Sequence, residues 1–478
     1  MHIVDLFAGT GALSSGFKKL VNEPYCTYIE QNRSACETIL YNHLRQFDEK
    51  FSAQNLQIVR SGLRMMPTQS LKSFSISKAS IYELELSDKN DVRTLLADEI
   101  CKSGSTQTGP RIVVGGPPCQ AYSLIGRSKN KSLVSYEAAL DHRHYLYREY
   151  LKSLVAFEPD VFVFENVKGL LTSKVNDRII FRDILAELHS PGRNTDLRNK
   201  GIKYRLYSLT NPDAVVSTDN DVKEIELKSF LVDCSQYGMR QKRERIFVIG
   251  VRSDILLRPD VLGDLGNFTQ ASHNKKLNKL RGKFSDKRYE VDWLASRSRQ
   301  FNDLINRSSS LGLHTLSQHL EKAWSSFKKT DFAEADPYIN HNVRRHMFED
   351  IARYTLLAAA AVVPNDLSNK QLINAFELEP KHMSWSTSNS FSDRFSVVPE
   401  LGKCQTITSH ISKDGHYYIH HDPIQGRSLS VREAARIQGY DDEFKFMGNI
   451  TSQYTQVGNA VPPTISELIA NCCRKILK

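Results

Sequence analysis

The sequence predicts an α/β fold built on a doubly wound sheet, and three observations lead to this prediction. Residues 1–20 read as a short apolar strand, a glycine-containing turn and an amphipathic helix. Residues 161–164, VFVF, form a continuous apolar run of the kind that is buried on both faces of a parallel sheet. Helical patterns that suit the same architecture return late in the chain, at 430–438 and 464–475.

Composition restricts the class of protein. The 478 residues are 40% hydrophobic and 25% charged, which is typical of soluble globular proteins. No apolar run approaches the length of a membrane span, and the start of the chain lacks the pattern of a secretory signal. The eight cysteines are scattered without a Cys-x-x-Cys pair, which fits a reducing, cytoplasmic compartment. The net charge of +10 favours a polyanionic partner such as nucleic acid.

The first turn suggests a nucleotide-type cofactor. Residues 8–11, AGTG, join the first strand to a helix, so backbone N–H groups face a ligand at the positive helix end. Glu30 ends the second strand about 20 residues beyond Gly9, where a doubly wound sheet places its ribose-binding carboxylate. A tight structural turn and a solvated glutamate that opens the helix at 33–44 are the alternatives. The turn and the acid together favour the cofactor.

A second loop carries a candidate nucleophile. The apolar run 112–114 leads into GGPPCQ at 115–120. The glycines let the chain turn, the prolines stiffen it, and Cys119 follows at the tip. A thiol held on a rigid loop at a strand end is well placed for covalent catalysis. A structural turn with a buried cysteine is equally consistent with the hexapeptide alone.

Two further segments place charged groups beside predicted core strands. Glu165 follows the run 161–164, at the sheet edge where open α/β sheets bind ligands, although a helix-capping acid is the alternative. Before the strand at 246–249, alternation puts Arg243 and Arg245 on one side, where two guanidinium groups suit an anion or a carboxylate. A solvated charged face is the alternative for this pair.

The β/α alternation stops near Arg252, and we interpret 254–426 as an inserted domain. Within it, residues 271–299 hold nine Lys/Arg against three Asp/Glu, with Tyr289 and Trp293 interleaved. This stretch contacts phosphates or forms a solvated surface. A helix is predicted at 343–363. The histidines of this region, at 410, 416, 420 and 421, have no metal-ligand partners in the pattern, so we expect no metal.

The end of the chain returns to the α/β pattern. The helix at 430–438 opens with a capping box formed by Ser430 and Glu433. Residues 456–463, QVGNAVPP, read as a turn before a closing helix at 464–475.

Six motifs occur in the order found in the DNA cytosine-5 methyltransferases, and the chain resembles that family, in particular its members from prokaryotic restriction-modification systems. The motifs are DLFAGTG at 5–11, GGPPCQ at 115–120, ENV at 165–167, QKRER at 241–245, REAARIQG at 432–439 and QVGN at 456–459. The resemblance implies the mixed, Rossmann-like sheet of S-adenosyl-L-methionine (AdoMet)-dependent methyltransferases, flanked by helices. It assigns 1–253 and 427–478 to the catalytic domain and 254–426 to an inserted target-recognition domain.

The resemblance also implies a set of cofactor-binding residues and no metal. Those that would line or complete the AdoMet pocket are Phe7, Ala8, Gly9, Thr10, Gly11, Pro118 and Asn459. Glu30 would bind the ribose hydroxyls. Where the family usually carries an Asp-Ile pair at the adenine, this chain offers Ser80 and Ile81, with Asp88 as a weaker candidate.

The implied reaction is methylation of C5 of a cytosine flipped out of duplex DNA. Cys119 would add to C6 as a thiolate and turn the ring into a nucleophile. Glu165 would protonate or hydrogen-bond N3, Arg245 would hold O2, and Arg243 would favour ionisation of the thiol. A monomer acting on double-stranded DNA, alongside a restriction endonuclease or defence system, is the expected setting. A tRNA-directed relative and a catalytically silent DNA-binding module are the alternatives.

Overall fold

The computed structural model describes residues 1–21, 25–30, 32–46, 56–61, 80–84, 109–118, 146–175, 177–194, 201–257, 289–328, 339–341, 344–380, 394–474 and 476–477. They belong to two compact units. The sheet unit comprises Met1–Gly238, Arg243–Ser272 and Ala460–Lys478. The helical unit comprises Met239–Lys242 and His273–Asn459.

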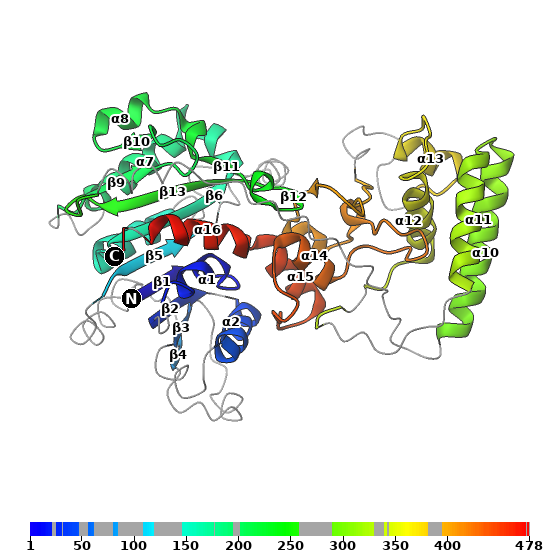
Figure 1. The fold of residues 1–478 in the computed structure, drawn as a ribbon, viewed down its shortest axis with the longest axis horizontal. Helices are drawn as coiled ribbons and strands as arrows, with labels where there is room; N and C mark the ends of the chain where they lie inside the picture. Colours follow the sequence, from blue (N-terminus) through cyan, green and yellow to red (C-terminus); the bar gives the residue numbers. More distant parts are fainter. Residues whose placement is uncertain are drawn as a thin grey trace, which may run out of the picture. The chain divides into compact units, whose positions relative to one another are not determined.

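The sheet unit is built on a mixed sheet, as predicted. Among the described residues it has ten strands, in the order β10-β9-β13-β6-β5-β1-β2-β3-β4 with β11 paired to β13 (Figure 1). The strands are β1 (His2–Leu6), β2 (Tyr25–Glu30), β3 (Leu56–Ser61), β4 (Ser80–Leu84), β5 (Arg111–Gly115), β6 (Val161–Val167), β9 (Tyr204–Tyr207), β10 (Val215–Val216), β11 (Leu231–Asp233) and β13 (Glu244–Arg252). From β4 to β6 all neighbours are parallel, whereas β13 is antiparallel to β6, β9 and β11.

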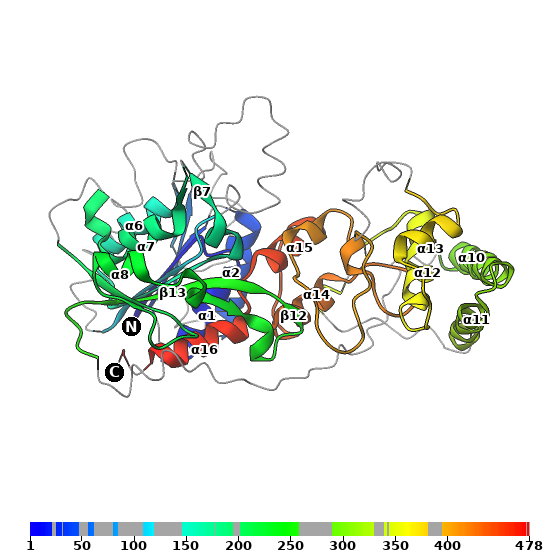
Figure 2. The same ribbon diagram turned by 90° about the horizontal axis from the view of Figure 1, so that it is seen from above.

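Helices cover both faces of this sheet. Figure 2 shows α6 (Leu146–Phe157) and α7 (Ile180–His189) on one face, with α1 (Ala12–Lys18) and α16 (Pro463–Cys473) on the other. The VFVF run lies in β6, near the centre of the sheet, and all four of its residues are buried. The phenolic O–H of Tyr150 on α6 donates to the carbonyl of Val163, which fixes this helix against β6. The continuous apolar run therefore predicted a central strand correctly.

Further elements complete the sheet unit. They are α2 (Arg33–Gln46), η4 (Lys168–Thr172), β7 (Lys174–Val175), β8 (Arg178–Ile179), η5 (Pro191–Asn194), α8 (Asp219–Glu224), η6 (Leu227–Phe230) and η7 (Cys234–Tyr237). None of the helices in the described ranges is both long and apolar enough to cross a membrane.

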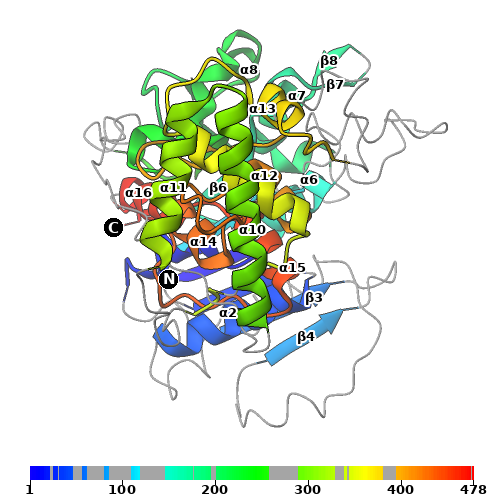
Figure 3. The ribbon, with the colours of Figure 1, turned by 90° about the vertical axis from the view of Figure 1, so that its right-hand side faces the viewer.

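The helical unit has its own apolar core. Its elements are β12 (Gln241–Lys242), α10 (Tyr289–Ser310), α11 (His314–Lys328), α12 (Phe348–Ala360), α13 (Asn369–Ala375), β14 (Cys404–Gln405), η9 (Ser409–Ser412), η10 (His416–Tyr418), α14 (Val431–Gln438) and α15 (Ile450–Asn459). Helices α10 and α11 lie side by side (Figure 3). The rings of Phe301 and Trp324 stack between these two helices, and Tyr354 of α12 belongs to the same core.

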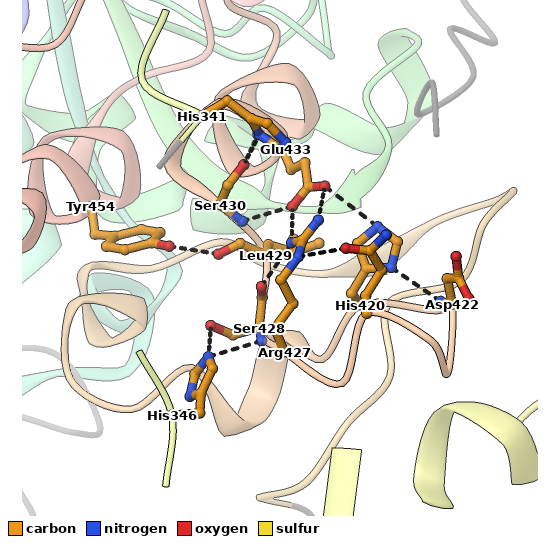
Figure 4. A network of polar contacts seen from close by, with 11 residues as sticks. His341, His346, His420, Asp422, Arg427, Ser428, Leu429, Ser430, Glu433 and Tyr454 are labelled. Atoms are coloured by element: carbon orange, nitrogen blue, oxygen red, sulfur yellow. Dashed lines mark hydrogen bonds and ion pairs between the residues drawn. The ribbon is translucent and has the colours of Figure 1, made fainter. Parts of the chain in front are cut away.

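A buried ion pair organises the start of α14. Arg427 donates from Nη1 and Nη2 to the two carboxylate oxygens of Glu433, at 2.7 and 2.8 Å (Figure 4). Ser430 caps the helix by accepting from the Glu433 N–H, and Glu433 Oε2 accepts from the Ser430 N–H, which confirms the predicted capping box. Burial raises the pKa of Glu433, but Arg427 and His420 outweigh it and hold that pKa well below its usual range.

Two predictions of element bounds differ from the structure. The helix expected at 343–363 is the shorter α12. Residues 456–459, expected in a turn, form the last turn of α15. The helix has glycine at position 458 because a Cβ there would overlap the backbone of Thr408 and Ser409, which pack against it. The compact helical unit also extends to Asn459, so α14 and α15 group with it and not with the sheet.

Candidate active site

The predicted cofactor turn joins β1 to α1 at the carboxyl edge of the sheet. Phe7, Gly9 and Gly11 all adopt left-handed φ angles, of 56°, 56° and 71°. The Gly9 N–H donates to Glu30 Oε2 at 2.7 Å, so the turn and the acid meet at the ends of the neighbouring strands β1 and β2. A Cβ on Gly9 would meet no atom of the described residues within 4 Å, so none of them fills the space beside this turn.

Glu30 is itself held in place. Its other carboxylate oxygen, Oε1, accepts from the Asn32 N–H at 2.7 Å. Each oxygen thus receives a backbone donor, from Gly9 and from Asn32. Glu30 therefore orients the turn that follows β1.

The second predicted loop runs directly against Glu165. An ideal Cβ on Gly116 would lie 2.5 Å from Glu165 Oε2, so only glycine leaves room for the carboxyl group at this position. Gly115 is equally confined, by the Leu6 carbonyl at 2.7 Å. The loop is described to Pro118, and Cys119 lies outside the described residues.

Glu165 lies inside β6, near its end, and pairs with Arg245 of the neighbouring β13. Arg245 Nε is 3.2 Å from Glu165 Oε1, and each side chain is 13% exposed. Burial raises the pKa of Glu165, although the guanidinium groups of Arg245 and Arg243 act in the opposite direction. The carboxyl group can therefore stay protonated at a higher pH than an exposed glutamate, as an acid that donates to a ring nitrogen requires.

Arg243 is more deeply buried than Arg245. Its side chain donates from Nη2 to the carbonyl of Ala460 at 2.8 Å, and its own carbonyl accepts from the Cys234 N–H. Ala460 is the residue that follows Asn459. Arg243 therefore joins the strand that carries Arg245 to the segment that leads into α16.

Sequence reasoning missed Asn166. Its side-chain Nδ2 donates to the Pro117 carbonyl at 3.3 Å, and its Oδ1 accepts from the Val167 N–H at 2.9 Å. The amide thereby attaches the 115–118 loop to β6, beside Glu165. A buried polar residue in an apolar strand was the available signal, because such a group needs hydrogen-bond partners.

The other predicted cofactor residues are only partly placed. Ser80 and Ile81 belong to β4, and Asp88 lies outside the described residues. Asn459 ends α15 in the helical unit. Within the described ranges, no three His, Cys, Asp or Glu side chains gather as metal ligands would.

Comparison with known proteins agrees with the motifs. The family model described as C-5 cytosine-specific DNA methylase matches residues 79–197 and 223–475, well over half of the chain. The type II methyltransferase M.Bpa9945I of Bacillus paralicheniformis is 29% identical over 100% of this chain and 99% of its own. M.DdeI of Desulfomicrobium norvegicum, also a type II methyltransferase, is 23% identical over 98% and 88%.

A solved E. coli structure, named for a prophage-encoded DNA modification methyltransferase, has the same fold. Its TM-score is 0.51, with 16% identity and coverage of 100% and 99%. The DLFAGTG turn precedes the ranges that the family model matches, but M.Bpa9945I matches over the whole chain. The protein belongs to the C-5 cytosine-specific DNA methylase family.

Proposed function

We propose that this protein transfers the methyl group of AdoMet to C5 of a cytosine within a specific duplex DNA sequence. The observation that carries the proposal is the buried Glu165–Arg245 pair, set against Gly116 in the loop that leads to Cys119. Family membership supports DNA as the substrate. The type II relatives support a modifying role beside a restriction endonuclease that acts on the same sequence in the cytoplasm.

The residues present fit AdoMet. The turn formed by Phe7, Ala8, Gly9, Thr10 and Gly11 has no described group within 4 Å of a Cβ at Gly9, and the Glu30 carboxylate, to which we assign the ribose hydroxyls, lies at this turn. By resemblance to the family, we propose Ile81, Pro118 and Asn459 as further cofactor-binding residues. When bound, AdoMet supplies an electrophilic methyl group.

The proposed chemistry divides between a nucleophile and an acid. Cys119 adds to C6 as a thiolate, and the ring electrons then make C5 nucleophilic. Glu165 donates its proton toward N3, where negative charge would otherwise build up, and Arg245 holds O2. Methyl transfer would leave S-adenosyl-L-homocysteine, a base such as water would take the proton from C5, and departure of the Cys119 thiolate would restore the aromatic ring. Arg243 favours the ionised thiol and stabilises the loop geometry.

The target cytosine must leave the helix for this chemistry, because its C5 and C6 are shielded in stacked DNA. We assign recognition of the duplex to the helical unit, together with the basic stretch at 271–299, of which 271–288 lies outside the described residues. Basic residues there would hold phosphates, and other side chains would read base edges.

The first test is methyl transfer from labelled AdoMet to unmethylated duplex DNA, followed by base-resolution mapping of 5-methylcytosine. We expect label at one short sequence context. Cys119→Ala should abolish transfer and retain DNA binding. Preferential transfer to tRNA in a competition assay would favour the tRNA-directed alternative, and DNA binding without any transfer would favour the silent module.

A further inference from the structure

Helices α1 and α16 meet with their backbones in contact. A Cβ on Gly16 would overlap the carbonyl of Ser466, so glycine permits the close approach of the two helices. Both residues are buried. The contact joins the helix that follows the cofactor turn to the helix that follows Asn459.

The hydroxyl group of Ser466 enters the hydrogen bonding of α1. It accepts from the Gly16 N–H at 2.9 Å and donates to the Leu13 carbonyl. A helical serine usually bonds a carbonyl of its own helix, as Ser153 on α6 does with Glu149. Ser466 instead bonds across to α1 with a donor and an acceptor at once. The hydroxyl therefore adds two directional bonds to the packing of the two helices.

Helix α16 is also held at its start, on the side of the base site. The Ala460 carbonyl accepts from Arg243, and Arg243 lies beside Glu165 closely enough to affect its pKa. The segment from Ala460 to Ser466 is therefore tied at one end to the Arg243–Arg245 strand and at the other to α1. Any sliding of α1 along α16 would move the turn that α1 follows.

We propose that Ser466 is a positioning residue for the AdoMet site, whose hydroxyl fixes α1 and the Phe7–Gly11 turn in register with α16. This proposal rests on AdoMet being the cofactor, as the proposed function states. The hydroxyl touches no reacting atom. It acts through Leu13 and Gly16, and its effect is expected in cofactor affinity and not in the chemical step.

The test compares S-adenosyl-L-homocysteine affinity by calorimetry in the full-length wild type, Ser466→Ala and Ser153→Ala. Ser153 is the matched control, because it is equally buried and its hydroxyl bond stays within its own helix. Loss of the cross-helix bonds in Ser466→Ala should raise the Kd about tenfold. Ser153→Ala should change it less than about twofold. At saturating AdoMet, Ser466→Ala should keep the wild-type single-turnover rate and DNA affinity, with only the KM for AdoMet raised.

A second pair of variants guards against simple misfolding. The new side chains in Ser466→Thr and Ser466→Val have nearly the same size, but only threonine keeps a hydroxyl. The Ser466→Thr variant should therefore bind S-adenosyl-L-homocysteine more tightly than Ser466→Val. Equal affinity of this pair, or equal loss in Ser466→Ala and Ser153→Ala, overturns the inference. A wild type that binds no S-adenosyl-L-homocysteine overturns the proposed function itself, whereas normal binding by Ser466→Ala overturns only the role of Ser466.

Discussion

Replacing Gly116 by alanine is expected to disable the acid of the proposed reaction while leaving the cofactor site intact. The new Cβ would lie 2.5 Å from Glu165 Oε2, whereas ordinary contacts to a Cβ begin at 3.4 Å. The carboxyl group must therefore retreat by about 1 Å, and a displacement of about 1 Å at a reacting group can cost about 100-fold in rate. Gly116 does not require a left-handed φ, so the backbone itself accepts alanine.

Single-turnover transfer from labelled AdoMet to substrate DNA measures this effect. We expect Gly116→Ala to be slower by about 30- to 100-fold, with unchanged affinity for S-adenosyl-L-homocysteine. Glu165→Asp provides the control background, because the shorter side chain leaves room for the methyl group. In the Glu165→Asp background, Gly116→Ala should slow the single-turnover rate by a much smaller factor. Such non-additive effects are expected only of residues in contact. Equal costs in both backgrounds, or full activity of Gly116→Ala, would refute the reasoning.

Other predictions follow from the same contacts. Because burial raises the pKa of Glu165 and its protonated form acts, the transfer rate should fall as pH rises through that pKa, and Glu165→Gln should lose this pH dependence; an unchanged profile would contradict the acid role. Glu30→Ala should weaken S-adenosyl-L-homocysteine binding by more than about tenfold in calorimetry, since the bond from Gly9 is lost as well, and Glu30→Gln should weaken it less. Burial lowers the pKa of His346 to about 3, so the neutral imidazole stabilises the fold fully above about pH 6.5, and this stabilisation is lost as the pH falls. Urea unfolding should therefore show a loss of about 2 to 3 kcal/mol in unfolding free energy at pH 4.5, and His346→Gln should lack this loss. Arg427→Met should cost about 3 to 5 kcal/mol of unfolding free energy because Glu433 is left charged and buried, and adding Glu433→Leu should recover most of it; no recovery would argue against the ion pair as the cause.

The sequence pattern correctly predicted the parts of the fold that are determined by residues close together in the chain. The VFVF run became the central strand β6, and the Ser430/Glu433 capping box opened α14 as expected. The Gly-containing turn and Glu30 meet because parallel neighbouring strands end at one edge. These features follow from sequence spacing alone.

The remaining features depend on contacts between distant segments. Gly458 reads as a turn residue, yet it lies in α15, where the backbone of Thr408 and Ser409 leaves no room for a Cβ. The bond from Asn166 to Pro117 and the bond from Arg243 to Ala460 join segments whose proximity no local pattern encodes. The same holds for the restriction at Gly116, because its cause is the side chain of Glu165 on another strand.

The pairing of α1 with α16 also bears on the synthesis of the protein. Gly16 and its hydrogen-bond partner Ser466 are 450 positions apart. At usual translation speeds of about 5 to 20 residues per second, the second helix is made about 20 to 90 seconds after the first. During that interval α1 lacks the contacts that it makes with α16 in the folded protein. A chain whose synthesis stops before Ser466 would therefore contain all six motifs, but its sheet unit would lack most of α16 and the bonds from Ser466 to α1.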